Sequence, residues 1–174
     1  AGLLPSVAAR IAMVLLAWAA FGALVAHFFL PGFGLLPGRL LRRLPSRLGP
    51  CALALTFDDG PHPETTPAIL DALAAAGVNA TFFLVGEHAR RAPALVRRIA
   101  AEGHAIGNHT QRHRLLVFRT QGQLAVEIAE CQDTLAAILG APPRLFRPPH
   151  GFKAIGLWSA LRRHDLTMAA WTGA

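Results

Sequence analysis

Two short polar segments contain side chains that are able to take part in metal-assisted hydrolysis. In the first, TFDDGPH, Asp58 and Asp59 are adjacent, and their mutual repulsion means that a cation or a basic partner is needed to keep both ionised. In the second, HTQRH, His109 and His113 are four residues apart, which on a helical turn places both imidazoles about 6 Å apart, within reach of one metal ion. Taken singly, these segments are also compatible with an Asp-Gly turn and with a pair of exposed histidines.

A third segment, RLFRPPHG, has a double proline directly after Arg147 and alone is typical of a proline-rich turn. The three segments together are more specific, because each follows a predicted strand, and parallel folds gather their sites at the carboxyl ends of strands. One carboxylate and two histidines form a three-ligand metal set, which leaves the second carboxylate as a base. The same set also binds iron in oxygenases, so the metal does not follow from the ligands alone.

The elements that must position these segments alternate between strands and helices after residue 50. Short apolar runs predict strands, and stretches that end at glycine predict helices. The alternation indicates an α/β fold with βαβ units, right-handed crossovers and a mostly parallel sheet or barrel. The predicted strands are 51–57, 79–86, 104–107, 144–146 and 166–171, and the predicted helices are 64–76, 92–102, 122–139 and 154–164.

An apolar run of 20 residues, 11–30, precedes this part of the chain. A helix of that length reaches about 30 Å, the thickness of the hydrocarbon core of a bilayer. We interpret the run as one transmembrane anchor, because it is longer than a usual signal-peptide core and its one A-x-A site lies inside it. A cleaved signal peptide and a buried soluble helix are the alternatives. Prolines and glycines then end the helix, and residues 39–47 form a basic linker.

The composition limits the class of protein further. A length of 174 residues allows one domain with an appendage, and 53% hydrophobic residues exclude a disordered polyelectrolyte. The net charge of +7 comes mainly from five arginines before residue 49, where no acidic residue offsets them, so a nucleic-acid partner is not indicated. The two cysteines, Cys51 and Cys131, are too few for a disulfide framework.

In this order and spacing, TFDDGP, HTQRH and RPPHG resemble the first three motifs of the polysaccharide deacetylases, which include chitin and peptidoglycan deacetylases. The resemblance covers residues 49–174, after an anchor and basic linker in residues 1–48. It implies a distorted (β/α) barrel, a divalent metal, most often zinc, and hydrolysis of an N-acetyl group on a GlcNAc-type sugar. Three residues match the metal ligands of the family: Asp59, His109 and His113.

The resemblance also implies three catalytic residues. Asp58 matches the general base, and Arg147 matches the arginine that orients this base. The backbone N–H of His150 is expected to hold the developing oxyanion together with the metal; the family often has tyrosine at this position. His62, His88 and His104 lack matching partners and are expected at the surface or behind the site.

The sequence departs from the family at its C-terminus. Family members continue past the position of Trp171 to a late Leu-His, whose histidine protonates the leaving amine, and His164 does not replace it because it lies in a predicted helix. We therefore expect a C-terminally truncated chain with an incomplete barrel and impaired activity. A non-catalytic, membrane-tethered module that binds metal and glycan is the alternative function.

We expect the partners to be the membrane and an acetylated polysaccharide such as chitin or peptidoglycan. An O-acetyl ester or a small cyclic amide is an alternative substrate. The positive-inside rule favours a cytoplasmic domain, because four arginines follow the apolar run and one precedes it. The implied substrates nevertheless lead us to expect a periplasmic or extracellular domain.

Overall fold

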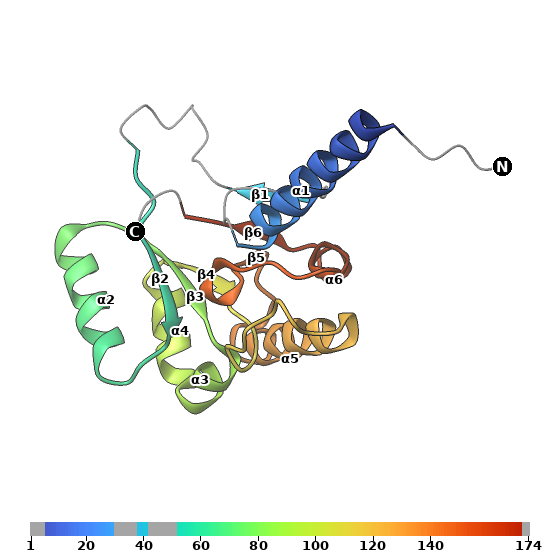
Figure 1. The fold of residues 1–174 in the computed structure, drawn as a ribbon. Coiled ribbons are helices and arrows are strands. Elements are labelled where there is room, and N and C mark those ends of the chain that lie inside the picture. Colours follow the sequence, from blue (N-terminus) through green and yellow to red (C-terminus); the bar gives the residue numbers. More distant parts are fainter. Residues whose placement is uncertain (1–5, 30–37, 42–51, 172–174) are drawn as a thin grey trace.

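The computed structural model describes residues 6–29, 38–41 and 52–171. Its centre is a six-stranded sheet with the order β1-β6-β5-β4-β3-β2, in which every neighbouring pair is parallel (Figure 1). The strands are β1 (Leu40–Leu41), β2 (Thr56–Gly60), β3 (Thr81–Leu84), β4 (Ala105–Asn108), β5 (Leu145–Phe146) and β6 (Thr167–Ala169). The helices are α1 (Val7–Phe29), α2 (Thr65–Ala76), α3 (Gly86–Arg91), α4 (Pro93–Ala101), α5 (Gln121–Leu139), α6 (Leu157–Arg163) and the 3-10 turn η2 (Pro149–Gly151).

The predicted parallel α/β fold is confirmed. Among the described strands, β1 and β2 form the two edges, so the sheet is open, in agreement with an incomplete barrel. The structure adds two elements that the sequence did not predict. One is α3, and the other is β1, a two-residue strand from the basic linker that pairs with β6.

The first strand of the domain lies later than predicted. It was expected to end at Phe57, but β2 continues through both aspartates to Gly60. Its pairing with β3 is irregular between Phe57 and Gly60, and Asp59 has a φ of 67° in this stretch. This irregularity brings Asp58 and Asp59 to the end of the strand, whereas Cys51, the predicted first residue, lies outside the described residues.

The helix ends agree closely with the glycine pattern. Gly77 and Gly140 follow α2 and α5 in the left-handed conformation, with φ of 64° and 83°. Glycine adopts this conformation without the steric cost of a Cβ, so it ends a helix readily. At the other end of α5, Thr120 and Gln123 form a reciprocal capping box that satisfies two backbone N–H groups.

Helix α5 connects two clusters of buried apolar side chains. Its Leu124 and Ile128 pack into the cluster around α6, β5 and β6. One to two turns later, Cys131 and Leu135 pack into the cluster around α2, α4 and β3. Since α5 packs into both clusters, its position in the core is well supported.

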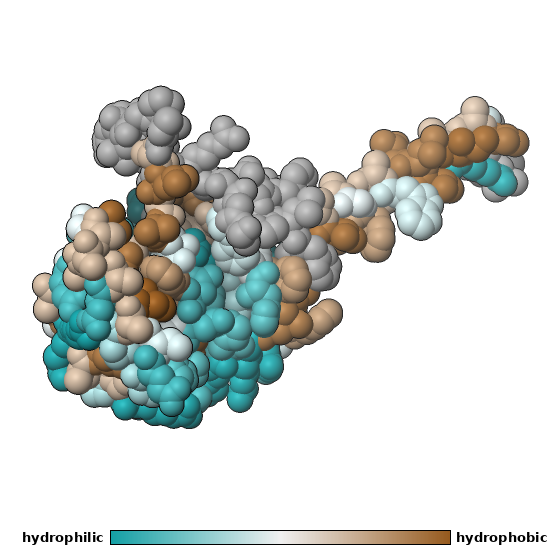
Figure 2. All heavy atoms as spheres, turned by 90° about the vertical axis from the view of Figure 1, so that its left-hand side faces the viewer, coloured by the Kyte–Doolittle hydropathy of each residue, from teal (hydrophilic) through white to brown (hydrophobic). Residues whose placement is uncertain are grey.

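Helix α1 begins at Val7, four residues before the predicted span, and its apolar side chains are largely exposed. Leu16 is 69% exposed and Trp18 68% exposed. Figure 2 shows this apolar helix projecting from the rest of the molecule. By length and composition, α1 is able to cross a membrane, and it is the one helix of this kind in the described ranges.

Candidate active site and metal centre

The predicted site residues lie at the carboxyl ends of three parallel strands of the sheet, β2, β4 and β5. Asp58 and Asp59 are in the last part of β2, His109 directly follows β4, and Arg147 directly follows β5. Parallel strands present their carboxyl ends at one edge of the sheet, which explains why residues almost 90 positions apart meet here. The structure thus brings together the three polar segments of the sequence.

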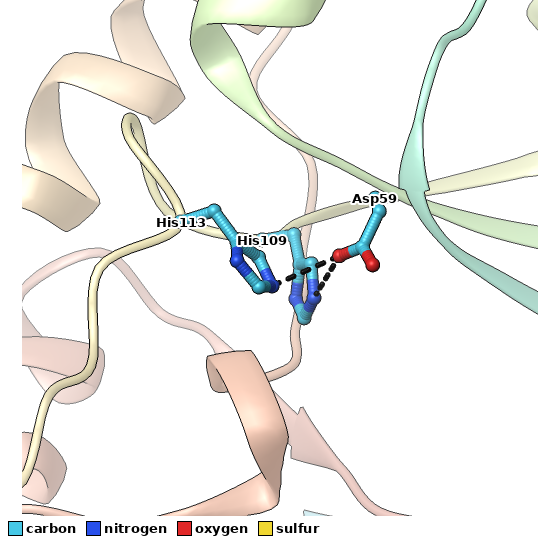
Figure 3. Close-up of side chains that lie close together, drawn as sticks. All are labelled: Asp59, His109 and His113. Atoms are coloured by element: carbon cyan, nitrogen blue, oxygen red, sulfur yellow. Dashed lines mark ion pairs between the residues drawn. The ribbon is translucent and has the colours of Figure 1, made fainter.

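The closest group consists of the carboxylate of Asp59 and the imidazoles of His109 and His113. Oδ1 of Asp59 lies 3.2 Å from Nε2 of His109 and 2.9 Å from Nε2 of His113. Figure 3 shows the two rings directed at the same carboxylate oxygen, with Asp59 coming from β2 and the histidines from the loop after β4. One ligand atom from each residue lies within 4.8 Å of the other two, as is suited to a single metal ion.

The orientation of His109 supports metal binding. Nδ1 of His109 lies 2.7 Å from the carbonyl oxygen of Arg147, which only accepts, so Nδ1 carries the proton and donates. Burial of the ring is the main cause that lowers the pKa of His109, which favours the neutral form. In that form Nε2 presents a lone pair to Asp59. Two acceptors facing each other at 3.2 Å repel, and a cation between them removes this repulsion.

His113 reaches the site by a route that the sequence did not predict. The i, i+4 spacing suggested a helical turn, and this explanation is wrong, because residues 109–113 form no helix. Thr110 and His113 instead have φ of 67° and 52°, and the Thr110 Oγ1 accepts a hydrogen bond from the His113 N–H at 3.1 Å. The imidazole rings of His109 and His113 still come to 5.1 Å between centroids.

Arg147 holds the second aspartate. Its Nη1 donates to Oδ1 of Asp58 at 2.7 Å and to Oγ1 of Thr56 at 2.8 Å, and its guanidinium lies 4.0 Å above the ring centroid of Phe83. The side chain of Arg147 is 4% exposed, whereas that of Asp58 is 28% exposed. A buried guanidinium therefore fixes a carboxylate that water is still able to reach.

His88 is a supporting residue that the sequence analysis left without a partner. Nδ1 of His88 lies 2.8 Å from the backbone oxygen of Asp59, the residue with the left-handed φ. A residue other than glycine keeps the left-handed backbone conformation only when its surroundings hold it there. Of the other two histidines without a match, His62 is exposed and His104 is buried.

His150 lies beside the three possible metal ligands. It occupies the centre of η2 with a φ of 58°, and its exposed ring makes an edge contact with the ring of His113 at 4.9 Å. The double proline indicated a proline-rich turn here, and η2 is such a turn. The resulting turn presents His150 to solvent next to His113.

Several known proteins are similar to this chain in sequence. The family model described as polysaccharide deacetylase matches residues 47–169. A peptidoglycan-N-acetylglucosamine deacetylase from Bacillus cereus is 48% identical over 57% of this chain and 36% of its own length. A chitooligosaccharide deacetylase from Azorhizobium caulinodans is 35% identical over 70% of this chain and 58% of its own length. The chain thus spans less than two thirds of each of these curated relatives.

Two solved structures are similar in fold and sequence. A family 4 carbohydrate esterase from Streptomyces lividans, in complex with acetate, is 37% identical with a TM-score of 0.66, over 68% of this chain and 62% of that one. A family 4 acetyl xylan esterase from Clostridium thermocellum, in complex with a cobalt ion, is 34% identical with a TM-score of 0.61, over 66% and 55% of the two chains.

Proposed function

Because the chain belongs to the polysaccharide deacetylase family, we propose that it contains the metal-binding part of a hydrolase that removes N-acetyl groups from a GlcNAc-containing polysaccharide. The observation that carries this proposal is the convergence of Asp59, His109 and His113 beside an aspartate held by Arg147. In this proposal the domain comprises residues 49–174, and residues 1–48 provide the anchor and linker.

The proposed metal is a divalent ion, with zinc as the first choice. Two neutral imidazoles and one carboxylate are a common ligand set for catalytic zinc, and one related structure contains cobalt. A divalent ion held there would polarise the substrate carbonyl and make a water molecule more acidic. The carbonyl of Arg147 keeps Nε2 of His109 directed at the metal position.

Asp58 is the proposed general base. Its Oδ1 is held by Arg147, which leaves Oδ2 as the oxygen that we assign to proton transfer from water. Arg147 itself does not reach the reacting atoms; it acts by orienting Asp58. The N–H of His150 is the proposed donor to the developing oxyanion, since η2 lies beside His113.

The substrate that we propose is a cell-wall or chitin-like glycan. One relative is named for peptidoglycan and another for chitooligosaccharides. Both of these glycans contain N-acetylated sugars. Helix α1 would tether the domain to a membrane so that it reaches such a polymer on the periplasmic or outer side. Acetylated xylan is the second candidate, because an acetyl xylan esterase is among the related structures.

The test is acetate release by the full-length protein from N-acetylglucosamine oligomers, peptidoglycan and acetylated xylan. We expect release from one of the two N-acetylated substrates, at the impaired rate expected from the sequence, with loss after chelation and recovery when zinc or cobalt is added. The variant Asp58→Asn is the control for contaminating activity and should be inactive. Release that persists in Asp58→Asn, or that does not respond to chelation, would contradict the proposal.

A further inference from the structure

An ion cluster lies behind the metal site, around Arg112 in the loop between β4 and α5. Nη1 of Arg112 lies 2.6 Å from Oε2 of Glu130 and 3.3 Å from Oε1 of Glu127, both on α5. Its Nε lies 3.7 Å from Oε1 of Glu87 on α3. Hydrogen bonds to Glu130 and Glu127 raise the pKa of the Arg112 guanidinium above its ordinary value, so it is always charged.

Glu127 also bonds the backbone of the loop. Its Oε2 accepts a hydrogen bond from the N–H of Arg112 at 2.9 Å, and its backbone oxygen accepts one from the N–H of Gln111 at 3.0 Å. The side chain of Glu127 is 6% exposed, and a buried carboxylate is costly unless its acceptor sites are satisfied. Here the loop satisfies them, so the loop and the carboxylate stabilise each other.

The loop needs such support because it has no regular structure of its own. Thr110 and His113 have positive φ, a conformation that is unfavourable for a residue other than glycine. Arg112 directly precedes His113, so the backbone position of Arg112 determines where the Cα of His113 lies. Glu127 on α5 therefore bonds the residue that directly precedes His113, a proposed metal ligand.

An anion-binding role for this region is less well supported. A cavity of about 260 Å³ is lined by Arg112, Arg114 and Arg119 together with residues of α5, as an acidic ligand would require. Arg112, however, is already paired with three carboxylates, those of Glu87, Glu127 and Glu130. The charge of Arg112 is thus satisfied within the fold, which makes this arginine a poor ligand for an anion.

We propose that Glu127 is a positioning residue for the metal centre, which acts through Arg112 and the loop backbone to hold His113 in place for binding. The proposal rests on the proposed function only in requiring that Asp59, His109 and His113 bind a metal ion. It assigns a second role to α5, which carries none of the ligands. Glu130 contacts the Arg112 guanidinium but not the backbone N–H of Arg112, so we assign it no such role.

The test is the affinity of the protein for Co²⁺, measured by calorimetry and by the visible absorption spectrum of the bound ion. We expect Glu127→Ala to lower the affinity by about tenfold to a hundredfold, the usual effect of removing a group that orients a metal ligand. Glu127→Gln should lower it less, because one acceptor oxygen remains. Glu130→Ala is the matched control and should stay within about twofold of the parent, since its side chain is 43% exposed and bonds no loop N–H.

The spectrum separates positioning from general stability. Thermal unfolding of the metal-free variants reports stability, whereas a changed cobalt spectrum in a folded variant reports a displaced ligand. If Glu127→Ala does not fold, Glu127→Gln takes its place. A folded Glu127 variant with the affinity and spectrum of the parent would overturn the inference. Absence of Co²⁺ binding by the parent would overturn the proposed function as well, so the two failures are distinguishable.

Discussion

The backbone oxygen of Arg147 accepts a hydrogen bond from Nδ1 of His109 at 2.7 Å. The guanidinium of the same arginine donates to Asp58, also at 2.7 Å. One residue therefore orients a proposed metal ligand through its main chain and the proposed base through its side chain. A substitution of Arg147 changes only the second of these contacts, which makes the two functions separable.

We expect Arg147→Lys to reduce activity by about tenfold to a hundredfold while metal affinity stays near that of the parent. Lysine retains the charge but loses the planar guanidinium, whose Nη1 donates to both Asp58 and Thr56 and which lies over the ring of Phe83. Acetate release and metal binding, measured on the same preparation, check this. A large loss of metal affinity in a folded Arg147→Lys protein would contradict the separation.

His109→Ala and His113→Ala should each lower metal affinity by orders of magnitude, because each removes one of three proposed ligands. Equilibrium dialysis against zinc, followed by metal analysis, measures the effect. His62→Ala is the matched control, since His62 is exposed and belongs to no group of possible ligands among the described residues. Equal metal occupancy in the His109/His113 double variant would refute the ligand assignment.

The parallel fold and the meeting of the three polar segments were predictable, because both follow from local patterns. Apolar runs that alternate with glycine-terminated helices define βαβ units, and the strand ends of such units converge. The loop from His109 to His113 was not predictable in this way. Its backbone is bonded to Glu127, 15 residues later in the sequence, and no local pattern marks this contact.

Two further features were also missed because they depend on long-range backbone contacts. Strand β1 forms where Leu40 and Leu41 pair with β6, more than 120 residues later in the sequence, and two leucines carry no strand signal of their own. His88 supports Asp59 through a backbone oxygen, which every residue type offers. No sequence pattern marks such a contact.

The thiol of Cys131 should be unreactive in the folded protein. Cys131 is fully buried, and burial raises the pKa of its thiol from 9.0 to about 12, which lowers the thiolate fraction about a thousandfold. In a Cys51→Ser background, a disulfide reagent at pH 8 should modify Cys131 only after a denaturant is added. Rapid modification of the native protein would contradict the burial.

The same pKa shift affects stability at high pH. Above about pH 9 the unfolded chain loses the Cys131 proton while the folded chain retains it, so the folded state binds more protons. The free energy of unfolding should therefore fall as the pH rises from about 9 to 12. Comparison with Cys131→Ala isolates this contribution, because alanine does not ionise.

Helix α1 should keep the protein in the membrane fraction after a carbonate wash, because its apolar side chains are otherwise exposed to water. Leu16→Arg places a charge near the middle of the helix, which raises the free energy of membrane insertion by about 2.5 to 3.5 kcal/mol. This variant should release part of the protein from the membrane, and Leu16→Ile is the matched control. Mass spectrometry of the mature N-terminus distinguishes an anchor, which keeps α1, from a signal sequence, which loses it.

Protease treatment of intact cells tests on which side of the membrane the domain lies. We expect cleavage once the outer barrier of the cell is permeabilised, as for a periplasmic or extracellular domain. Protection that is lost only when the inner membrane is opened would place the domain in the cytoplasm. That result would agree with the arginine count around α1 and would contradict the proposed substrates.

The two adjacent aspartates should differ in what their loss removes. In the full-length protein, Asp58→Asn should reduce the rate of acetate release by a factor of about 10² to 10⁴. It should leave the metal affinity near that of the parent, because it removes only a base. Asp59→Asn should lose both, because Oδ1 of Asp59 is the oxygen that both His109 and His113 face. The amide retains the size of each carboxylate, so packing at the end of β2 is preserved. Metal analysis and acetate release, measured on both variants, decide the assignment. The reverse pattern, in which Asp58→Asn loses the metal and Asp59→Asn retains it, would exchange the roles of the two residues.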